Sequence, residues 1–183
     1  MKVYSYNNNT QLSPHFNAQE FRCKCGGNHE IKIDEKLIEK LEKVFTALNC
    51  SKIIISSGFR CPSHSVKDGG YANDKHTEGF AADFIAYGKD GKPIPAYKVC
   101  CVCQDIGFTG IGRIDNNAVH ADTRTFGTWK GDESRGNDTV TADFYTYFNV
   151  TKKDVYGETE TAKKHTIELL IDGKSIYKGG FEL

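Results

Sequence analysis

Three short segments carry side chains that could bind a metal and catalyse hydrolysis. They are residues 57–60 (SGFR), 76–83 (HTEGFAAD) and 119–122 (VHAD). Taken singly each is a weak signal, because an isolated loop histidine or strand aspartate usually faces solvent. If His76, Asp83 and His120 lie on adjacent strands and a loop, they could converge on one open face. Two imidazoles and one carboxylate form a catalytic zinc ligand set that leaves a fourth position for water.

The elements that must position these side chains follow from the hydrophobic pattern. Apolar residues recur at three- and four-residue steps over residues 34–49, which predicts an amphipathic helix with Asp34 as its N-cap. The β-branched run at 51–57 is typical of a strand buried on both faces. Residues 61–77 are polar and contain proline and glycines, so we expect a long ordered loop there.

Further along the chain, residues 79–87 alternate in a way that predicts a strand with Asp83 on one face. A second helix is expected over residues 96–106, where Gly107 ends it. Two more short strands are expected at 108–113 and 118–122, joined by a turn at 115–117.

In this order and spacing, the three segments resemble the zinc D-alanyl-D-alanine carboxypeptidases and L-alanyl-D-glutamate endopeptidases that cut peptidoglycan stem peptides. This group shares its fold with the vancomycin-resistance dipeptidase and the hedgehog signalling domain. Residues 12–16 (LSPHF) and 20–26 (EFRCKCG) resemble the first segment of one branch of these peptidases. The likeness covers about residues 11–126. It implies an α+β fold, with a small, mostly antiparallel sheet, helices on one side and zinc on the open side.

Carried over residue by residue, the resemblance makes His76, Asp83 and His120 the ligands of one zinc ion per chain. Arg60 would hold a substrate carboxylate or the polarised carbonyl oxygen, and Ser57 of the same segment would contact the substrate. Zinc lowers the pKa of its bound water to about 7, and a planar guanidinium suits an oxyanion better than lysine does. A structural ion pair is the alternative role for Arg60.

The general base is where this sequence departs from the resemblance. Many relatives carry Asp or Glu three residues before the last ligand, but here that position is Asn117, which cannot take up a proton. Asp115, at the same turn, is the first candidate. Asp122 is the second, either as the base or as a partner that orients an imidazole. Glu78, or a lost base and a weakened enzyme, are the remaining alternatives.

The composition changes beyond Arg124. We predict a zinc peptidase domain at residues 1–126 and a linker at 127–142, where small polar residues surround Trp129. Trp129 could stack on a ligand or dock the tail onto the main domain. Apolar runs on both sides of residues 172–173 (DG) predict a hairpin. Residues 143–183 would then be a small β-rich module or extension, which either binds wall polymer or covers an edge strand.

Composition excludes several classes of protein. The 183 residues carry 24 basic and 24 acidic side chains, so no net charge would attract nucleic acid or anionic lipid. Aliphatic runs are far shorter than the roughly 20 residues of a membrane span. The first residues lack an apolar signal segment. We therefore expect synthesis in the cytoplasm and action on the cell wall, after release as a phage or prophage lysin or through a dedicated machine.

The seven cysteines do not suggest a disulfide framework, because their number is odd and five fall in two tight clusters. We expect mostly free thiols. Cys23 and Cys25 with His29 could form half of a structural zinc site. The usual Cys-x-x-Cys spacing is absent, so core or turn thiols are favoured. The cysteines at 100, 101 and 103 cannot all face one metal from a helix.

We therefore predict a zinc metallopeptidase that hydrolyses a peptide bond in peptidoglycan stem peptides, as a carboxypeptidase or an endopeptidase. The competing hypothesis is a non-catalytic zinc-binding domain that recognises a cell-wall peptide or a protein partner, and Asn117 keeps it open. A redox or purely structural thiol protein would rest on the cysteine count alone.

Overall fold

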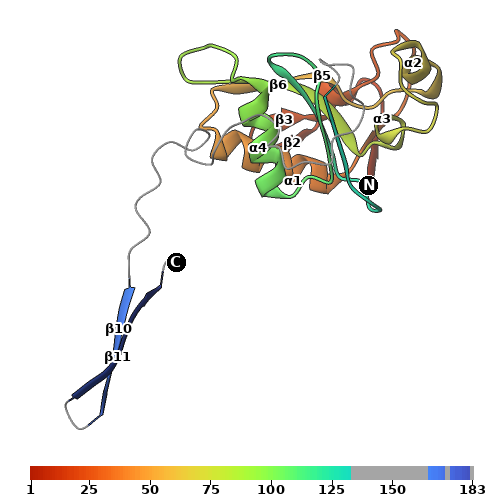
Figure 1. Cartoon of the computed structure of the whole chain (residues 1–183). Helices are drawn as coiled ribbons and strands as arrows, with labels where there is room; N and C mark the ends of the chain where they lie inside the picture. Colours follow the sequence, from red (N-terminus) through yellow and green to blue (C-terminus); the bar gives the residue numbers. More distant parts are fainter. Residues whose placement is uncertain (133–164, 172–173, 182–183) are drawn as a thin grey trace.

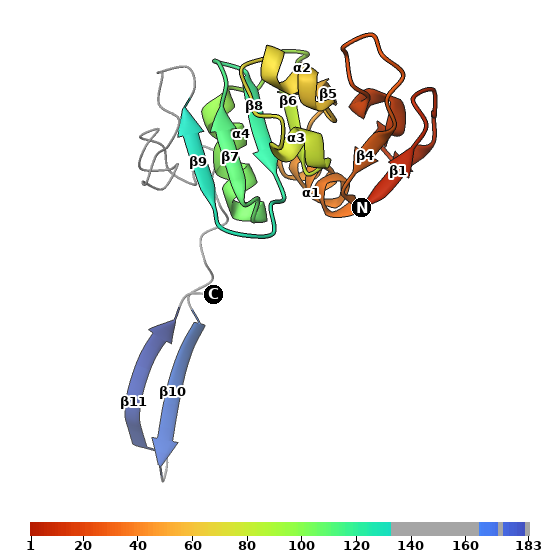
Figure 2. The same cartoon turned by 90° about the vertical axis from the view of Figure 1, so that its right-hand side faces the viewer.

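A five-stranded sheet carries the predicted ligands. The computed structural model describes residues 1–132, 165–171 and 174–181. Across the sheet the strands are β5 (Lys52–Ser57), β6 (Ala81–Tyr87), β8 (Ala118–Asp122), β7 (Gly110–Arg113) and β9 (Trp129–Asp132). All neighbours are antiparallel except β7 and β9, which run parallel. Figure 2 shows these strands side by side.

Two helices, α1 (Glu35–Ala47) and α4 (Ala96–Ile106), pack against one face of this sheet. They contact each other, and α4 packs against β7 and β8, behind which it is seen in Figure 2; Figure 1 shows the same helix in front. On β6, Ala82, Phe84 and Ala86 are fully buried in the core, while Asp83 between them belongs to the opposite face. The predicted α+β fold with a mostly antiparallel sheet is therefore confirmed.

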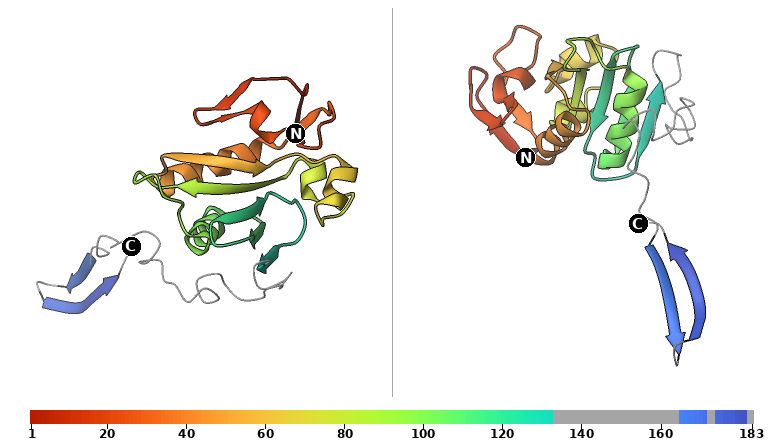
Figure 3. Two further views of the ribbon diagram at one scale, coloured as in Figure 1. Left: turned by 90° about the horizontal axis from the view of Figure 1, so that it is seen from above. Right: turned by 90° about the vertical axis from the view of Figure 1, so that its left-hand side faces the viewer.

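The first 33 residues form a layer beside the β5 edge of the sheet (Figure 3). Here β1 (Lys2–Tyr4) pairs with β4 (Ile31–Ile33), and β2 (Gln11–Ser13) pairs with β3 (Phe16–Asn17), which leads into the 3-10 helix η1 (Ala18–Phe21). A Cβ on Gly58 would lie 2.5 Å from the Cα of Phe21. The missing side chain lets the end of β5 pack directly against η1, and the Phe59 N–H donates to the Phe21 carbonyl at 2.8 Å.

Three local expectations differ from the structure. Residues 61–77 contain two short helices, α2 (Pro62–Lys67) and α3 (Lys75–Glu78), because Pro62 suits a first helical turn and the Asp74 side chain caps α3. Strand β5 is buried on one face only, since Ile54 is 42% exposed. Asp34 is the N-cap residue of α1 as expected, but its carboxylate accepts a hydrogen bond from Thr123 instead of the helix. No helix in the described ranges is long and apolar enough to cross a bilayer.

The tail contains the predicted hairpin: β10 (His165–Ile171) pairs antiparallel with β11 (Lys174–Phe181) around residues 172–173. The first part of the predicted linker behaves differently, because Trp129–Asp132 form the edge strand β9 of the main sheet. The main sheet therefore continues past residue 126, to Asp132. The rest of that linker, and residues 143–164 of the predicted module, lie outside the described residues.

We expect Phe84→Ala to lower the free energy of unfolding by about 3–5 kcal/mol, because it leaves a cavity at a fully buried position of the central sheet. The control is Ile54→Ala, at the exposed position of the neighbouring strand, which should cost less than about 1 kcal/mol. Chemical denaturation of both variants checks this difference. Equal losses would contradict the assignment of the two sheet faces.

Candidate metal centre

Strand pairing brings two of the three predicted ligands together. Asp83 of β6 lies directly opposite His120 of β8 in the antiparallel register. The third, His76, comes from α3, whose first turn is capped by Asp74 and which ends at Gly79 with φ of +84°. Glycine at this left-handed position turns the chain straight into β6. Residues 37 and 44 positions apart in the sequence thus meet on the face that α1 and α4 leave uncovered.

The ligand atoms of these residues form a small triangle. His120 Nδ1 lies 2.9 Å from Asp83 Oδ1. His76 Nε2 lies 3.2 Å from the same oxygen and 3.2 Å from His120 Nδ1. Bonds of about 2.0–2.2 Å at tetrahedral angles would separate zinc ligands by roughly 3.3 Å. Three sides of nearly that length therefore fit three corners of a zinc coordination tetrahedron, with the fourth corner left for water or substrate.

Both imidazoles are oriented by a partner on their other nitrogen. His76 Nδ1 lies 2.7 Å from the carbonyl oxygen of Gly58, so Nδ1 donates to this oxygen and Nε2 is the nitrogen that faces the triangle. His120 Nε2 lies 3.2 Å from Asp122 Oδ2. A carboxylate or carbonyl behind each imidazole is the usual arrangement around zinc-binding histidines.

Asp122 is buried, and both of its carboxylate oxygens accept hydrogen bonds. It has no exposed surface, and Arg124 donates to both of its oxygens, with Nε at 2.9 Å from Oδ1 and 3.1 Å from Oδ2. A Cβ on Gly110, its partner on β7, would lie 2.0 Å from Oδ2, so only glycine leaves room for this carboxylate. Asp122 is therefore placed to orient His120.

Arg60 and Ser57, the two ends of the Ser-x-x-Arg segment, contact each other at the same site. Arg60 Nε donates to Ser57 Oγ at 2.7 Å, and Nη2 donates to Asp83 Oδ2, the oxygen outside the ligand triangle. Asp68 Oδ2 lies 3.8 Å from Arg60 Nε and 3.4 Å from His64 Nε2. The guanidinium is thus held beside the triangle by a hydroxyl and two carboxylates.

The charges of the centre shift its pKa values in a consistent direction. Burial favours neutral Asp83, but the charge of His76 and the hydrogen bond from His120 outweigh it and hold the pKa well below its usual range. Burial likewise works against a charged His120, yet the hydrogen bonds to Asp122 and Asp83 raise its pKa to about 9. His120 is therefore an imidazolium at neutral pH when no metal is bound, and a metal must displace its Nδ1 proton.

Trp129 lies against His120 from the edge strand. Their ring planes meet at 89° with centroids 5.6 Å apart, and the Arg124 guanidinium sits 5.6 Å from the indole centroid. A Cβ on Gly112 would lie 2.7 Å from the indole, so a second β7 glycine makes space for this side chain. Trp129 thus belongs to the wall of the site and not to a linker.

The two other candidate bases make none of the hydrogen bonds or ion pairs with His76, Asp83 or His120 that are found among residues 1–132. Asp115 is exposed at the β7–β8 turn, where Oδ1 accepts the N–H groups of Asn117 at 2.7 Å and Ala118 at 2.6 Å. These bonds lower its pKa. Its Oδ2 takes part in none of the hydrogen bonds found among residues 1–132. Glu78 pairs with Lys75 on α3.

The comparison with known families fits this geometry. The family model described as Peptidase M15 matches residues 14–122, from the segment before η1 to the end of β8. The chain belongs to the M15 peptidase family. M15 peptidases are zinc-dependent, and the matched range contains the whole His76, Asp83 and His120 triangle. A search of curated proteins found no match.

Some residues that contact the centre were not predicted for these roles. Asp68 belongs to a segment expected to be a plain loop, and its approach to Arg60 depends on the unpredicted helix α2. Arg124 follows Asp122 by two residues, and residues at this spacing share one face of a strand. This spacing could have suggested the ion pair between the two side chains. The sequence around Trp129 is rich in glycine and aspartate, so it did not predict the strand that places this side chain beside the centre.

In metal-free protein, the His120 imidazole should titrate with a midpoint near 9, since its protonated ring donates to two carboxylates. Asp122→Asn removes one negative charge and should lower this midpoint. NMR of the histidine ring protons across pH measures it, with Asp90→Asn, at an exposed turn, as the matched control. A wild-type midpoint at or below the ordinary 6.5 would contradict the arrangement.

Proposed function

We propose that this M15 peptidase hydrolyses a peptide bond in peptidoglycan stem peptides, with zinc bound by His76, Asp83 and His120. The triangle of ligand atoms, with sides of 2.9–3.2 Å, is the observation that carries this proposal. When bound, zinc supplies Lewis acidity that polarises a carbonyl and makes water nucleophilic near neutral pH. We also propose that the protein acts at the cell wall, where this substrate is found.

Arg60 is proposed to stabilise negative charge on the substrate, either a terminal carboxylate or the carbonyl oxygen. Its guanidinium is 13% exposed at the side-chain level, and Nη1 makes none of the hydrogen bonds found among the described residues. Ser57 Oγ accepts a hydrogen bond from Arg60 Nε, so the Nη1 side of the guanidinium can face a bound peptide. A planar donor pair is suited to either anion. Both carboxypeptidase and endopeptidase action fit this role.

For proton transfer we propose Asp115, and for Asp122 a positioning role. Asp122 has no exposed surface, and Arg124 together with His120 holds its pKa well below the usual range although burial acts in the opposite direction. Such a carboxylate is a poor proton acceptor. Asp115 lies in the turn that leads into β8 and is open to solvent, with Oδ2 available.

The function is tested by measuring zinc content and release of amino groups from peptidoglycan. His120→Ala should lose one zinc ion per chain and lower the rate by about 10³-fold or more, because several kcal/mol of transition-state stabilisation disappear with the metal. His15→Ala, on a histidine that stacks on Phe45 of α1, is the matched control and should change neither. Zinc bound at this site without amino-group release would instead support the non-catalytic domain.

The variants Asp115→Asn and Asp122→Asn should distinguish the roles proposed for the two carboxylates. An asparagine oxygen can accept the same two backbone N–H groups, so the turn should keep its shape while the proton acceptor is lost. We expect kcat to fall by about 10²–10⁴-fold with zinc retained. Asp122→Asn should instead weaken zinc binding by about 10–100-fold. Unchanged kcat in Asp115→Asn would overturn the assignment of Asp115.

A further inference from the structure

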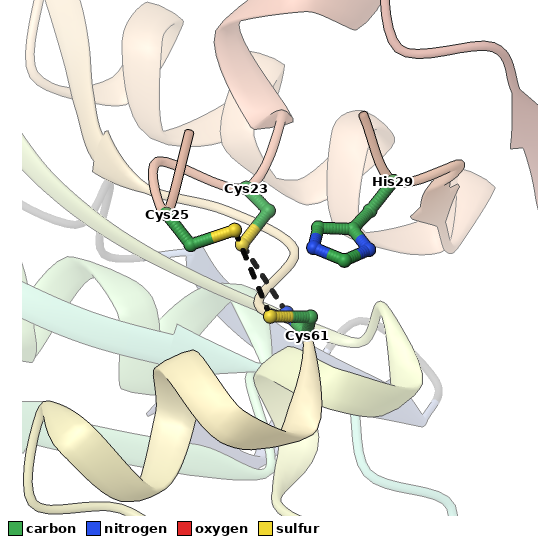
Figure 4. A group of neighbouring side chains, drawn as sticks. All are labelled: Cys23, Cys25, His29 and Cys61. Carbon is green, nitrogen blue, oxygen red and sulfur yellow. Dashed lines mark hydrogen bonds between the residues drawn. The ribbon is translucent and has the colours of Figure 1, made fainter. Parts of the chain in front are cut away.

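A second group of side chains that could bind a metal lies where the N-terminal layer meets the start of α2. Cys23 and Cys25 follow η1, His29 precedes β4, and Cys61 starts α2. One ligand atom from each lies within 4.8 Å of every other, and Figure 4 shows the four side chains converging. These residues come from two parts of the chain that are 36 positions apart at Cys25 and Cys61. We call them the Cys3His cluster.

We propose that the Cys3His cluster binds a second zinc ion, with a structural role. Three thiolates and one imidazole complete a tetrahedral set, which is the closed type of site that holds a fold together. It is distinct from the His76, Asp83 and His120 centre, where one corner stays open. This inference does not depend on the peptidase activity.

The sulfur geometry fits a metal better than a disulfide. The Sγ atoms of Cys25 and Cys61 are 3.8 Å apart. Zinc–sulfur bonds of about 2.3 Å at tetrahedral angles separate two sulfurs by roughly 3.8 Å, whereas a disulfide requires about 2.0 Å. A disulfide would also leave the third thiol of the cluster, Cys23, without a partner of its own kind.

Backbone N–H groups and two glycines position the sulfur atoms and the imidazole of the cluster. The N–H of Gly27 donates to Cys25 Sγ at 3.3 Å, and the N–H of Cys61 donates to Cys23 Sγ at 3.3 Å. At Cys23 burial raises the pKa of the thiol to about 11, and backbone hydrogen bonds act in the opposite direction, toward the thiolate that a metal binds. Gly26 turns the loop at φ of +87°. A Cβ on Gly27 would lie 2.7 Å from His29 Nε2, so glycine is what allows the imidazole to fold back toward the sulfurs.

Exposure separates this cluster from the other cysteines. Cys50, Cys100 and Cys103 are buried in the apolar core, where thiols act as small hydrophobic side chains. Cys25 is instead exposed, and His29 is half-buried. An exposed thiol beside two others and an imidazole has little packing value but is accessible to a metal ion from solvent.

A metal here would stiffen the substrate-binding side of the catalytic centre. Cys61 follows Arg60 directly, and Arg60 reaches Asp83. The cluster would therefore tie the N-terminal layer to the loop that holds this arginine, in addition to the backbone bond from Phe59 to Phe21.

Zinc content of the full chain purified under reducing conditions gives the first test. We expect two zinc ions per chain in the wild type and one in Cys25→Ser, whose exposed position tolerates the exchange. Cys50→Ala, which removes a buried thiol outside the cluster, is the matched control and should keep two. A wild-type protein that holds one ion, lost in His120→Ala, would overturn the proposal.

Cobalt(II) substitution gives a second readout, which does not depend on enzymatic activity. Thiolate ligands should produce sulfur-to-cobalt charge-transfer absorption, which the His76, Asp83 and His120 centre cannot produce. This absorption should persist in His120→Ala and disappear in Cys25→Ser, so failure of the catalytic centre is distinguished from failure of the cluster. Absence of the absorption in the wild type, or a zinc-free protein with a Cys25–Cys61 disulfide, would overturn the proposal.

The imidazole ligand is tested by the same spectra. His64 Nδ1 also approaches the cluster, at 3.3 Å from Cys23 Sγ, but it lies outside the set of four mutually close ligand atoms. We expect His29→Ala to shift the cobalt spectrum and His64→Ala to leave the coordination unchanged. The reverse result would overturn the assignment of His29.

Discussion

The buried carboxylate of Asp83 is the charge around which this domain is organised. At 6% exposure it cannot rely on water, so every nearby group supplies a compensating proton or positive charge. Oδ1 faces two imidazoles and Oδ2 faces the guanidinium of Arg60. The β6–β8 register, the short helix α3 and the loop after β5 each deliver one of these partners. A zinc ion bound here would replace protons in an environment that already favours a cation.

Much of this arrangement could be predicted from short-range patterns. Alternation along β6 placed Asp83 on the face opposite the core, and the resemblance of the three segments to zinc peptidases implied that His76 and His120 lie beside it. The roles of Asp122 and Trp129 could not be predicted equally well. They depend on which residues face them across the sheet, namely the β7 glycines at 110 and 112, and that register is a tertiary property. The parallel strand β9 is only four residues long, too short for its pattern to outweigh its glycine and aspartate content.

The cysteines show how the same residue type takes different roles in one chain. Cys100 and Cys103 lie on a helix face that packs against the sheet, where the sequence correctly indicated packing residues. Cys23 and Cys25 lacked the spacing usual for a zinc knuckle, because their third sulfur, on Cys61, comes from beyond β5. A ligand set divided between distant segments leaves no local motif. Only the packing of η1 against Gly58 brings its parts together.

The non-local origin of the catalytic triangle affects the order in which the domain folds. His76 and Asp83 are neighbours in the chain, but His120 reaches them only after α4 and the β7–β8 hairpin have closed a long loop. Contacts between residues far apart in the sequence form late, because closing the loop between them costs entropy before the contacts themselves contribute stability. A partly synthesised or partly folded chain therefore lacks the metal centre altogether. The ligand triangle of this M15 peptidase therefore arises only together with the completed β-sheet.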